Sequence, residues 1–306
     1  MLNRAILIKP EPLTLSIDWE DFGQLTSKNI DGILTSPTKA IERQTDILLS
    51  MLDDNNVKAT FFVLGMLANS RPDLLKKIAN EGHEIALHGM NHDSLFKLTA
   101  KQVVQDISDS KKLVSDITGQ KILGYRAPYF SILKENLHIL DILHDLEFTY
   151  DSSIMPVQMP RYGIHNFNTE DQLYSLPGGG EIVELPLTVK KFGWRKWPVA
   201  GGGYIRLMPM PVLRNLYSNF FKNNTDCMIY MHPYEFDTEK LDIADNLKNH
   251  ENISAIKTLY LNFRWNFLRQ SIRLKIDYLL KNYSFSTCKE KANYVKITTH
   301  SPTILG

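Results

Sequence analysis

Near its beginning the chain reads Leu13-Thr14-Leu15-Ser16-Ile17-Asp18-Trp19-Glu20-Asp21, an apolar–polar alternation that runs into three acids. The alternation over 13–17 predicts a β-strand, because successive side chains of a strand point to opposite faces. In parallel α/β proteins, sites form at the carboxyl ends of the strands. Three acids directly after a strand therefore indicate a site, provided that other strands end in the same way.

Short β-rich runs alternate with longer amphipathic segments through most of the chain. The further predicted strands are Lys58–Leu64, His83–Leu87, Ile122–Tyr125, Phe148–Tyr150, Glu181–Leu187 and Cys227–Met231. The predicted helices run from Ser36 as N-cap to about Asp54, from about Pro72 to Gly82, from Thr99 to Gly119, and near 134–145 and 210–221. This alternation predicts a parallel sheet, either open or closed into a barrel.

Two regions depart from this pattern. Residues 152–180 and 188–206 are rich in glycine, proline and aromatic residues, and each contains a run of three glycines. Such composition predicts long irregular loops, and long loops inside a compact domain are more often functional than not. Tyr129, Trp194, Trp197 and Tyr204 are candidates for stacking on a ligand or for packing the rim.

Composition limits the class of protein. The 306 residues include 35 Lys or Arg and 34 Asp or Glu, a formal net charge of +1 that gives no reason to expect a nucleic-acid partner. The apolar stretch Ala5–Ile8 is too short for a signal peptide, and no window approaches about 18 uninterrupted apolar residues, so no membrane span is predicted. Only Cys227 and Cys288 are cysteines, which suits a reducing compartment. We therefore expect a cytoplasmic enzyme.

The C-terminal part has a different character. From about 253 to 283 the chain is predicted to be helical, aromatic and basic. Asp277 is its only acid, against the basic residues Lys257, Arg264, Arg269, Arg273, Lys275 and Lys281. We expect helices whose apolar residues pack on the main domain while the basic residues stay solvated. The alternative is a helix that touches the inner membrane surface. The predicted domains are 1–250, the catalytic part, and 251–306, a helical extension.

Polar residues follow five of the predicted strands. After the acids of the first strand come His88 and His92, Arg126, Asp151 and His232, each at or near the end of another strand. Scattered polar residues would fall at either end of the strands. Their shared position predicts that all of them meet at one edge of the sheet.

Two histidines and an acid form a candidate metal site. His88 and His92 are four residues apart and converge on one ion if the segment makes a helical turn. Glu20 shares a face with Asp18 if the strand continues, so a cation at Glu20 leaves Asp18 free as a base. Asp21 is the alternative ligand, or else it caps the following turn. The set leaves coordination positions open for water and substrate.

With these residues in place, the chain resembles the polysaccharide deacetylase family, carbohydrate esterases with a NodB-type domain. The resemblance extends over roughly residues 10–240 through five ordered motifs. Three stretches look most like the branch associated with exopolysaccharide or surface-glycan loci: Asp18-Trp19-Glu20-Asp21, Gly201-Gly202-Gly203-Tyr204-Ile205-Arg206 and His232-Pro233-Tyr234-Glu235. The resemblance implies a distorted (β/α) barrel, a divalent ion that is usually zinc, and an N-acetylated amino-sugar glycan as substrate.

The resemblance also implies a role for each site residue. The metal ligands are His88 and His92 with one acid of the opening motif. The catalytic residues are Asp18 as general base, Arg126 orienting Asp18, His232 as general acid, Asp151 tuning His232, and Tyr129, whose backbone N–H helps to bind the oxyanion.

The chain departs from the family pattern in its motifs. The common opening motif is Asp-Asp-Gly, and Gly89 stands where the family usually has Ser or Thr after the first histidine. The tryptophan often found downstream of Asp151 is also missing. Two other hypotheses stay open: a metal-dependent hydrolase of a small non-sugar amide, and an inactive glycan-binding module.

Overall fold

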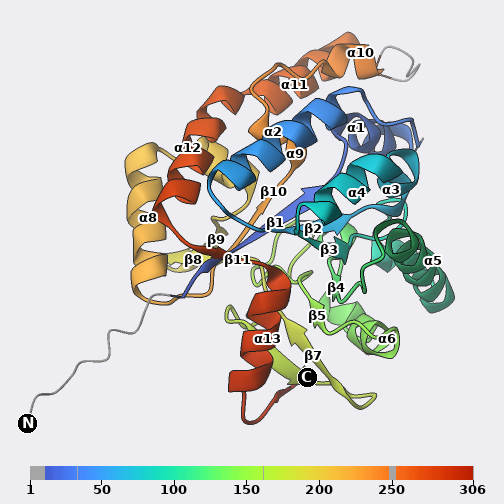
Figure 1. Cartoon of the computed structure of the whole chain (residues 1–306), viewed down its shortest axis with the longest axis vertical. Coiled ribbons are helices and arrows are strands. Elements are labelled where there is room, and N and C mark those ends of the chain that lie inside the picture. Colours follow the sequence, from blue (N-terminus) through green and yellow to red (C-terminus); the bar gives the residue numbers. More distant parts are fainter. Residues whose placement is uncertain (1–10, 33, 161, 248–252, 306) are drawn as a thin grey trace, which may run out of the picture.

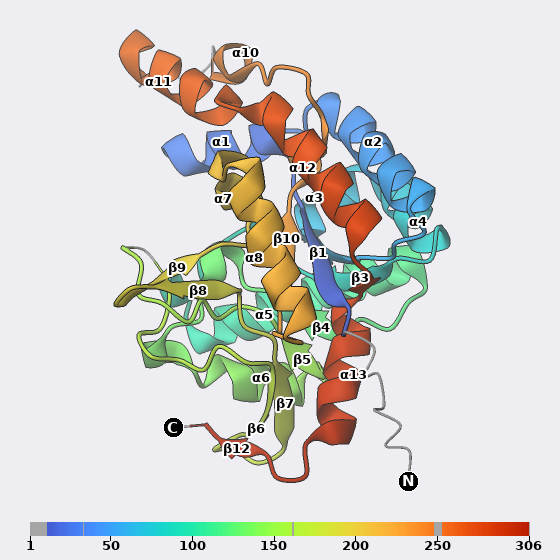
Figure 2. The ribbon, with the colours of Figure 1, turned by 90° about the vertical axis from the view of Figure 1, so that its left-hand side faces the viewer.

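The computed structural model describes residues 11–32, 34–160, 162–247 and 253–305. Figures 1 and 2 show a central β-sheet with helices packed around it. Within the described residues the sheet has the strand order β10-β1-β2-β3-β4-β5-β7-β6-β12, and β11 also pairs with β1. The strands are β1 Leu13–Trp19, β2 Thr60–Val63, β3 Glu84–Leu87, β4 Gly124–Tyr125, β5 Tyr150–Asp151, β6 Gln172–Ser175, β7 Glu181–Glu184, β10 Met228–Met231, β11 Phe285–Ser286 and β12 Thr303–Ile304.

Every predicted strand is confirmed, and the neighbours from β10 to β7 all pair in parallel. Thr188, shortly after β7, reaches the strand at the other end of this run. Its hydroxyl accepts a hydrogen bond from the Met228 N–H at 2.6 Å and donates one to the Met228 carbonyl at 3.2 Å. This side-chain link between β10 and the segment after β7 suits the predicted distorted (β/α) barrel.

The predicted helices appear in the predicted order with one corrected start, and the described residues before residue 230 form three further α-helices that were not predicted. Thr99 caps α5 (Ala100–Thr118) in a capping box, and Gly119 ends it in the left-handed conformation, as predicted. Ser36 is not an N-cap, because α2 begins later and spans Ala40–Asp54. The prediction missed α1 (Phe22–Asp31), which starts at Asp21. The remaining helices before residue 230 are α3 Gly65–Ser70, α4 Pro72–Asn80, α6 Ile139–Asp145, α7 Gly202–Leu207 and α8 Met210–Lys222.

The two predicted loop regions contain more regular structure than expected. The first includes β6, which pairs antiparallel with β7. The second forms a separate hairpin of β8 (Val189–Phe192) and β9 (Arg195–Pro198) and then α7. The glycines lowered the predicted content of secondary structure, although Gly202 of α7 serves close packing, as described below.

The C-terminal part is helical, as predicted, and also supplies strands. It consists of α11 (Ala255–Asn266), α12 (Arg269–Asn282), β11, α13 (Cys288–Thr298) and β12. In α12 the apolar residues Ile272, Ile276, Leu279 and Leu280 are buried, which confirms that this helix packs on the main domain. The expectation that the basic residues stay solvated is wrong for Arg269 and Lys275, which are buried. The predicted boundary at residue 250 lies outside the described residues and stays a prediction.

Three further predictions concern the N-terminal stretch, membrane-spanning helices and the cysteines. Ala5–Ile8, too short for a signal peptide, lies outside the described residues. Among the helices of the described ranges, none combines the length and apolar character needed to cross a bilayer. Cys227 and Cys288 are buried free thiols.

Candidate active site

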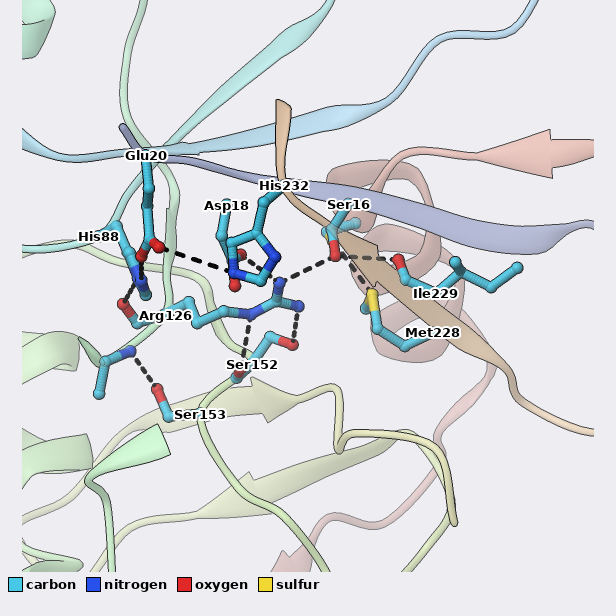
Figure 3. A network of polar contacts seen from close by, with 12 residues as sticks. Ser16, Asp18, Glu20, His88, Arg126, Ser152, Ser153, Met228, Ile229 and His232 are labelled. Carbon is cyan, nitrogen blue, oxygen red and sulfur yellow. Dashed lines mark hydrogen bonds and ion pairs between the residues drawn. The ribbon is translucent and has the colours of Figure 1, made fainter. Parts of the chain in front are cut away.

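Residues from the ends of several strands meet at one place, as the sequence predicted. Figure 3 shows Asp18 and Glu20 from the end of β1 beside His88, Arg126 and His232. Asp18, Glu20, His88 and Arg126 are buried, and the His232 side chain is 20% exposed. An open cleft of about 1430 Å³ is lined by the following site residues: Asp18, Glu20, His88, His92, Tyr129 and His232.

Glu20 lies between two imidazoles. Its Oε1 is 2.8 Å from His88 Nε2 and 3.0 Å from His92 Nε2, and the three donor groups lie within 4.8 Å of one another. Burial alone would raise the pKa of Glu20, but His92 and His88 hold it well below its ordinary value. Burial lowers the pKa of His92, which favours its neutral form. Glu20, rather than Asp21, is therefore the acid that the fold brings to the histidines.

The tautomer of His88 follows from its other nitrogen. His88 Nδ1 is 2.6 Å from the Arg126 carbonyl, which only accepts, so Nδ1 carries a proton. In neutral His88 the Nε2 lone pair then faces a carboxylate oxygen 2.8 Å away. Two such acceptors repel unless a proton or a cation lies between them. A backbone carbonyl on the far nitrogen is also typical of metal-ligating histidine.

His88 and His92 converge, although the segment between them does not make the helical turn on which the sequence analysis made their convergence depend. The segment is a loop, in which Gly89 and His92 have φ angles of 76° and 58°. These left-handed residues reverse the chain, so the imidazoles converge without helical spacing. A Cβ on Gly89 would lie 3.1 Å from the Asp106 carboxylate. The family's usual Ser or Thr would be strained at this position.

Arg126 holds Asp18, as the sequence predicted from the resemblance. Its Nη1 donates to Asp18 Oδ1 at 2.6 Å and to Ser16 Oγ at 2.9 Å. Its Nε and Nη2 donate to the carbonyl and hydroxyl of Ser152 at 3.0 and 2.8 Å. The guanidinium is fully buried and lies 4.0 Å from the Phe62 ring centroid. These contacts fix the orientation of the Asp18 carboxylate.

The partner of His232 differs from the expectation. Asp151 accepts hydrogen bonds from the backbone N–H and the hydroxyl of Ser153 at 2.9 and 2.6 Å, so the predicted pairing with His232 is wrong. His232 Nδ1 instead lies 3.2 Å from Glu235 Oε2, which also accepts from the His232 backbone N–H at 2.9 Å. Proline at 233 starts the short helix α9 (Pro233–Phe236) and places Glu235 in its first turn.

Three carboxylates act on His232. Burial lowers its pKa, but Glu235, Glu20 and Asp18 outweigh burial and raise the pKa to about 9. His232 Nε2 points toward the candidate metal site and lies 3.6 Å from Glu20 Oε2. The imidazole stacks on Tyr234 with ring centroids 4.9 Å apart. A protonated imidazole held this way can give a proton to a group in the cleft.

Asp151 has a structural environment instead. Together with Glu184 it forms a buried carboxyl pair, and Glu184 Oε1 accepts from the Ile154 N–H at 3.1 Å. Burial and the neighbouring acid raise the pKa of Glu184 well above its ordinary value, which favours a proton held within the pair. The Ser153 hydroxyl, bound by Asp151, accepts from the Ala127 N–H at 2.7 Å and so supports the backbone after Arg126.

Glu235 is the site residue that the sequence analysis missed, and the glycine run was its signal. A Cβ on Gly202 would lie 1.9 Å from a Glu235 carboxylate oxygen, whereas one on Gly203 would meet nothing within 4 Å. We expect Gly202→Ala to displace Glu235, to cost about 1–3 kcal/mol of stability, and to lower turnover. Gly203→Ala is the control and should leave both unchanged. Thermal unfolding and turnover of the two variants check this; equal behaviour would contradict it.

The remaining predicted residues divide into those at the cleft and those away from it. Tyr129 lines the cleft with a φ of 56°, and its ring lies 4.3 Å from that of His92. Asp21 caps α1 by accepting from the Gln24 N–H at 2.9 Å, and it also accepts from the Thr38 hydroxyl at 2.6 Å. Trp194 and Trp197 are exposed on the β8–β9 hairpin. Tyr204 lies beside Tyr162, with 3.5 Å between the hydroxyl oxygens.

The fold and the site define an α/β protein with a candidate metal-binding cluster at its strand ends, and comparison with known proteins gives the family. Residues 31–150 match the model "Polysaccharide deacetylase", and residues 152–293 match "Domain of unknown function (DUF3473)". The chain thus contains a polysaccharide deacetylase domain of the NodB type, which confirms the predicted family. The exopolysaccharide branch stays a prediction.

Individual relatives agree with this assignment. The chain is 37% identical over 93 residues to a peptidoglycan-N-acetylglucosamine deacetylase of Bacillus cereus, covering 30% of this chain and 34% of that protein. It is 32% identical over 151 residues to a peptidoglycan deacetylase of Helicobacter pylori, covering 45% and 50%. The chain therefore matches half or less of the length of these relatives.

A solved structure agrees over nearly the whole fold. The crystal structure of a putative polysaccharide deacetylase from Mycobacterium smegmatis has a TM-score of 0.60, with 97% of this chain and 95% of that chain covered. The two sequences are 19% identical, so the likeness concerns the fold.

Proposed function

We propose that the protein is a metal-dependent hydrolase that removes N-acetyl groups from an amino sugar of a polysaccharide or glycan precursor. The observation that carries the proposal is the cluster of Glu20, His88 and His92 in a cleft that also holds Asp18 and His232. The two relatives described above are named as a peptidoglycan-N-acetylglucosamine deacetylase and a peptidoglycan deacetylase, which supports the substrate class.

The donor set fits a divalent cation. Two imidazoles and one carboxylate suit zinc and leave coordination positions open. Among the described residues, the buried His92 Nδ1 has no hydrogen-bond partner, while Nε2 faces Glu20. Glu20, His88 and His92 would hold the ion, which supplies Lewis acidity toward an acyl oxygen and water.

The side chains around this cluster supply the proton transfers. Asp18, oriented by Arg126, accepts a proton from the attacking water. His232 gives a proton to the departing amine, which otherwise leaves poorly. Tyr129 lines the cleft, and we assign to its backbone N–H a part in binding the oxyanion.

Acetate release from a panel of substrates tests the function. Protein loaded with zinc or cobalt is incubated with N-acetylglucosamine oligomers, peptidoglycan fragments and small N-acetylated amines. We expect acetate and free amine from the glycans and loss of both after chelation. Release from small amides alone would favour the small-amide alternative. Glycan binding that is insensitive to chelator, without hydrolysis, would favour an inactive binding module.

The pH dependence of this reaction is a separate prediction. A raised pKa keeps His232 protonated, and hence able to act as an acid, until the pH rises through about 9. Glu235→Gln removes the carboxylate next to Nδ1, so the pKa falls and the alkaline limb of kcat/KM moves to lower pH. A pH–rate profile of both proteins measures this. An unchanged alkaline limb would show that Glu235 does not act on the general acid His232.

A further inference from the structure

Helix α11 has apolar residues on two opposite sides. Leu261 and Trp265 pack against a small core cluster that includes Tyr234 and Leu247. None of the residues of α11, all of which lie in the described ranges, is fully buried. The side facing away from this cluster is therefore open to solvent along the length of the helix.

That outer side is apolar. Ile256, Leu259, Tyr260 and Phe263 have exposed fractions of 82%, 70%, 58% and 61%, and Phe267 directly after the helix is 42% exposed. Their spacing is i, i+3, i+4, i+7 and i+11, which places them on one stripe of a helix. We name these five residues the α11 stripe. Exposed large apolar groups gathered in a row mark a surface that binds something.

Along the chain segment that carries the α11 stripe, the charged residues are all basic. The sequence from Ile253 to Ile276 contains no Asp or Glu and five basic residues. Lys257 and Arg264 fall next to the stripe at helical spacing and are exposed. Arg269 and Lys275, in contrast, are buried and bind backbone carbonyls, so they serve the fold. A stripe of Ile, Leu, Tyr and Phe flanked by cations complements an anionic lipid surface.

The position of α11 suits a flat partner. Figures 1 and 2 both show α11 at the outer edge of the molecule. Leu268 and Leu274 in the segment that follows, and Leu207 of α7, are further exposed apolar residues. The Arg206 guanidinium, one residue before Leu207, donates to the Trp265 carbonyl at 3.1 Å and so joins α7 to the end of α11.

We propose that the α11 stripe docks the protein on the headgroup region of an anionic lipid bilayer. The active-site cleft lies on the other side of the same helix, where Trp265 is part of its lining. Docking therefore holds the cleft about one helix diameter, roughly 10–12 Å, from the lipid surface. The inference goes beyond the proposed function and does not depend on it, because binding is measured without catalysis.

Co-sedimentation with vesicles tests the proposal on the full chain. One set of vesicles contains phosphatidylcholine with phosphatidylglycerol, and the other contains phosphatidylcholine alone. We expect binding to the anionic set that weakens as salt rises, because salt screens Lys257 and Arg264. Ile256→Asp and Phe263→Asp should each lower the partition coefficient at least about tenfold, since each removes a buried apolar side chain from the docked state.

A matched control separates docking from general surface polarity. Ile297 on α13 is 80% exposed, close to the 82% of Ile256, but lies away from the α11 stripe. Ile297→Asp should bind vesicles like the wild type, and thermal unfolding should show all three variants folded, because the replaced groups are exposed. The proposal is overturned if the wild type ignores anionic vesicles or if the stripe variants bind as well as Ile297→Asp. It is equally overturned if the stripe instead mediates a dimer. In that case analytical ultracentrifugation would show a wild-type dimer and a monomeric Phe263→Asp variant, and the wild type would not bind vesicles.

Discussion

Replacing Asp18 with Asn is expected to lower kcat for deacetylation by about 10²- to 10⁴-fold, because an amide cannot accept the proton of the attacking water. Asn keeps an oxygen in reach of Arg126, which donates to Asp18 across 2.6 Å. The melting temperature should fall, since the buried guanidinium loses its carboxylate partner. Metal content should stay near that of the wild type. Turnover and metal content of the same preparation check the prediction.

Asp21→Asn is the control for Asp18→Asn. Asp21 caps α1, and Asn caps helices about as well, so turnover and metal content should both survive the change. Undiminished turnover of Asp18→Asn would refute its role as the base. Loss of metal from Asp21→Asn would instead transfer the ligand role from Glu20 to Asp21.

His88→Ala is expected to remove metal and activity together. The imidazole supplies one of three donors, and its loss should weaken metal affinity by more than about 100-fold, the upper range for losing an outer-shell partner alone. Elemental analysis after gel filtration measures the metal, and acetate release measures activity. Excess zinc should restore little activity, because the two remaining donors hold the ion weakly.

His138→Ala is the control for this change. His138 is exposed and lies outside the residues that line the cleft, so its removal should leave both measurements unaltered. Full metal content in His88→Ala would show that the cluster is not the binding site. Equal losses in the two variants would point to nonspecific binding by histidine.

The ends of the strands were predicted well because the alternation of side chains that marks a strand can be seen within a short run of residues. A period-2 run such as Leu13–Ile17 shows where side chains alternate, and parallel order then places every strand end at one edge. His88, Arg126 and His232 were found in this way. The helix from Thr99 to Gly119 was predicted equally well, because the residues of its capping box and its terminal glycine can be recognised in the sequence.

Contacts that depend on packing were not visible in the same way. Glu235 lies next to His232 because Gly202, from a different helix, leaves space for its carboxylate. Asp151 follows a strand as the others do, yet its side chain turns to Ser153 and Glu184. The convergence of His88 and His92 depends on two left-handed residues in a loop, which helical spacing does not describe. In each case the register of a neighbouring segment determines the contact.

Strand β1, which carries Asp18 and precedes Glu20, is synthesised early, but one of the strands that pair with it is synthesised only near the end of the chain. Its partners along one edge are β11 and β2, and along the other β10, so Thr14 lies opposite both Ser286 and Met228. A ribosome-bound chain that has not yet produced residues 285–286 therefore holds β1 with unpaired backbone groups at its start. Such an edge pairs readily with other chains. Shortened forms that stop before β11 are thus expected to depend on chaperones and to aggregate, rather than to persist as weak enzymes.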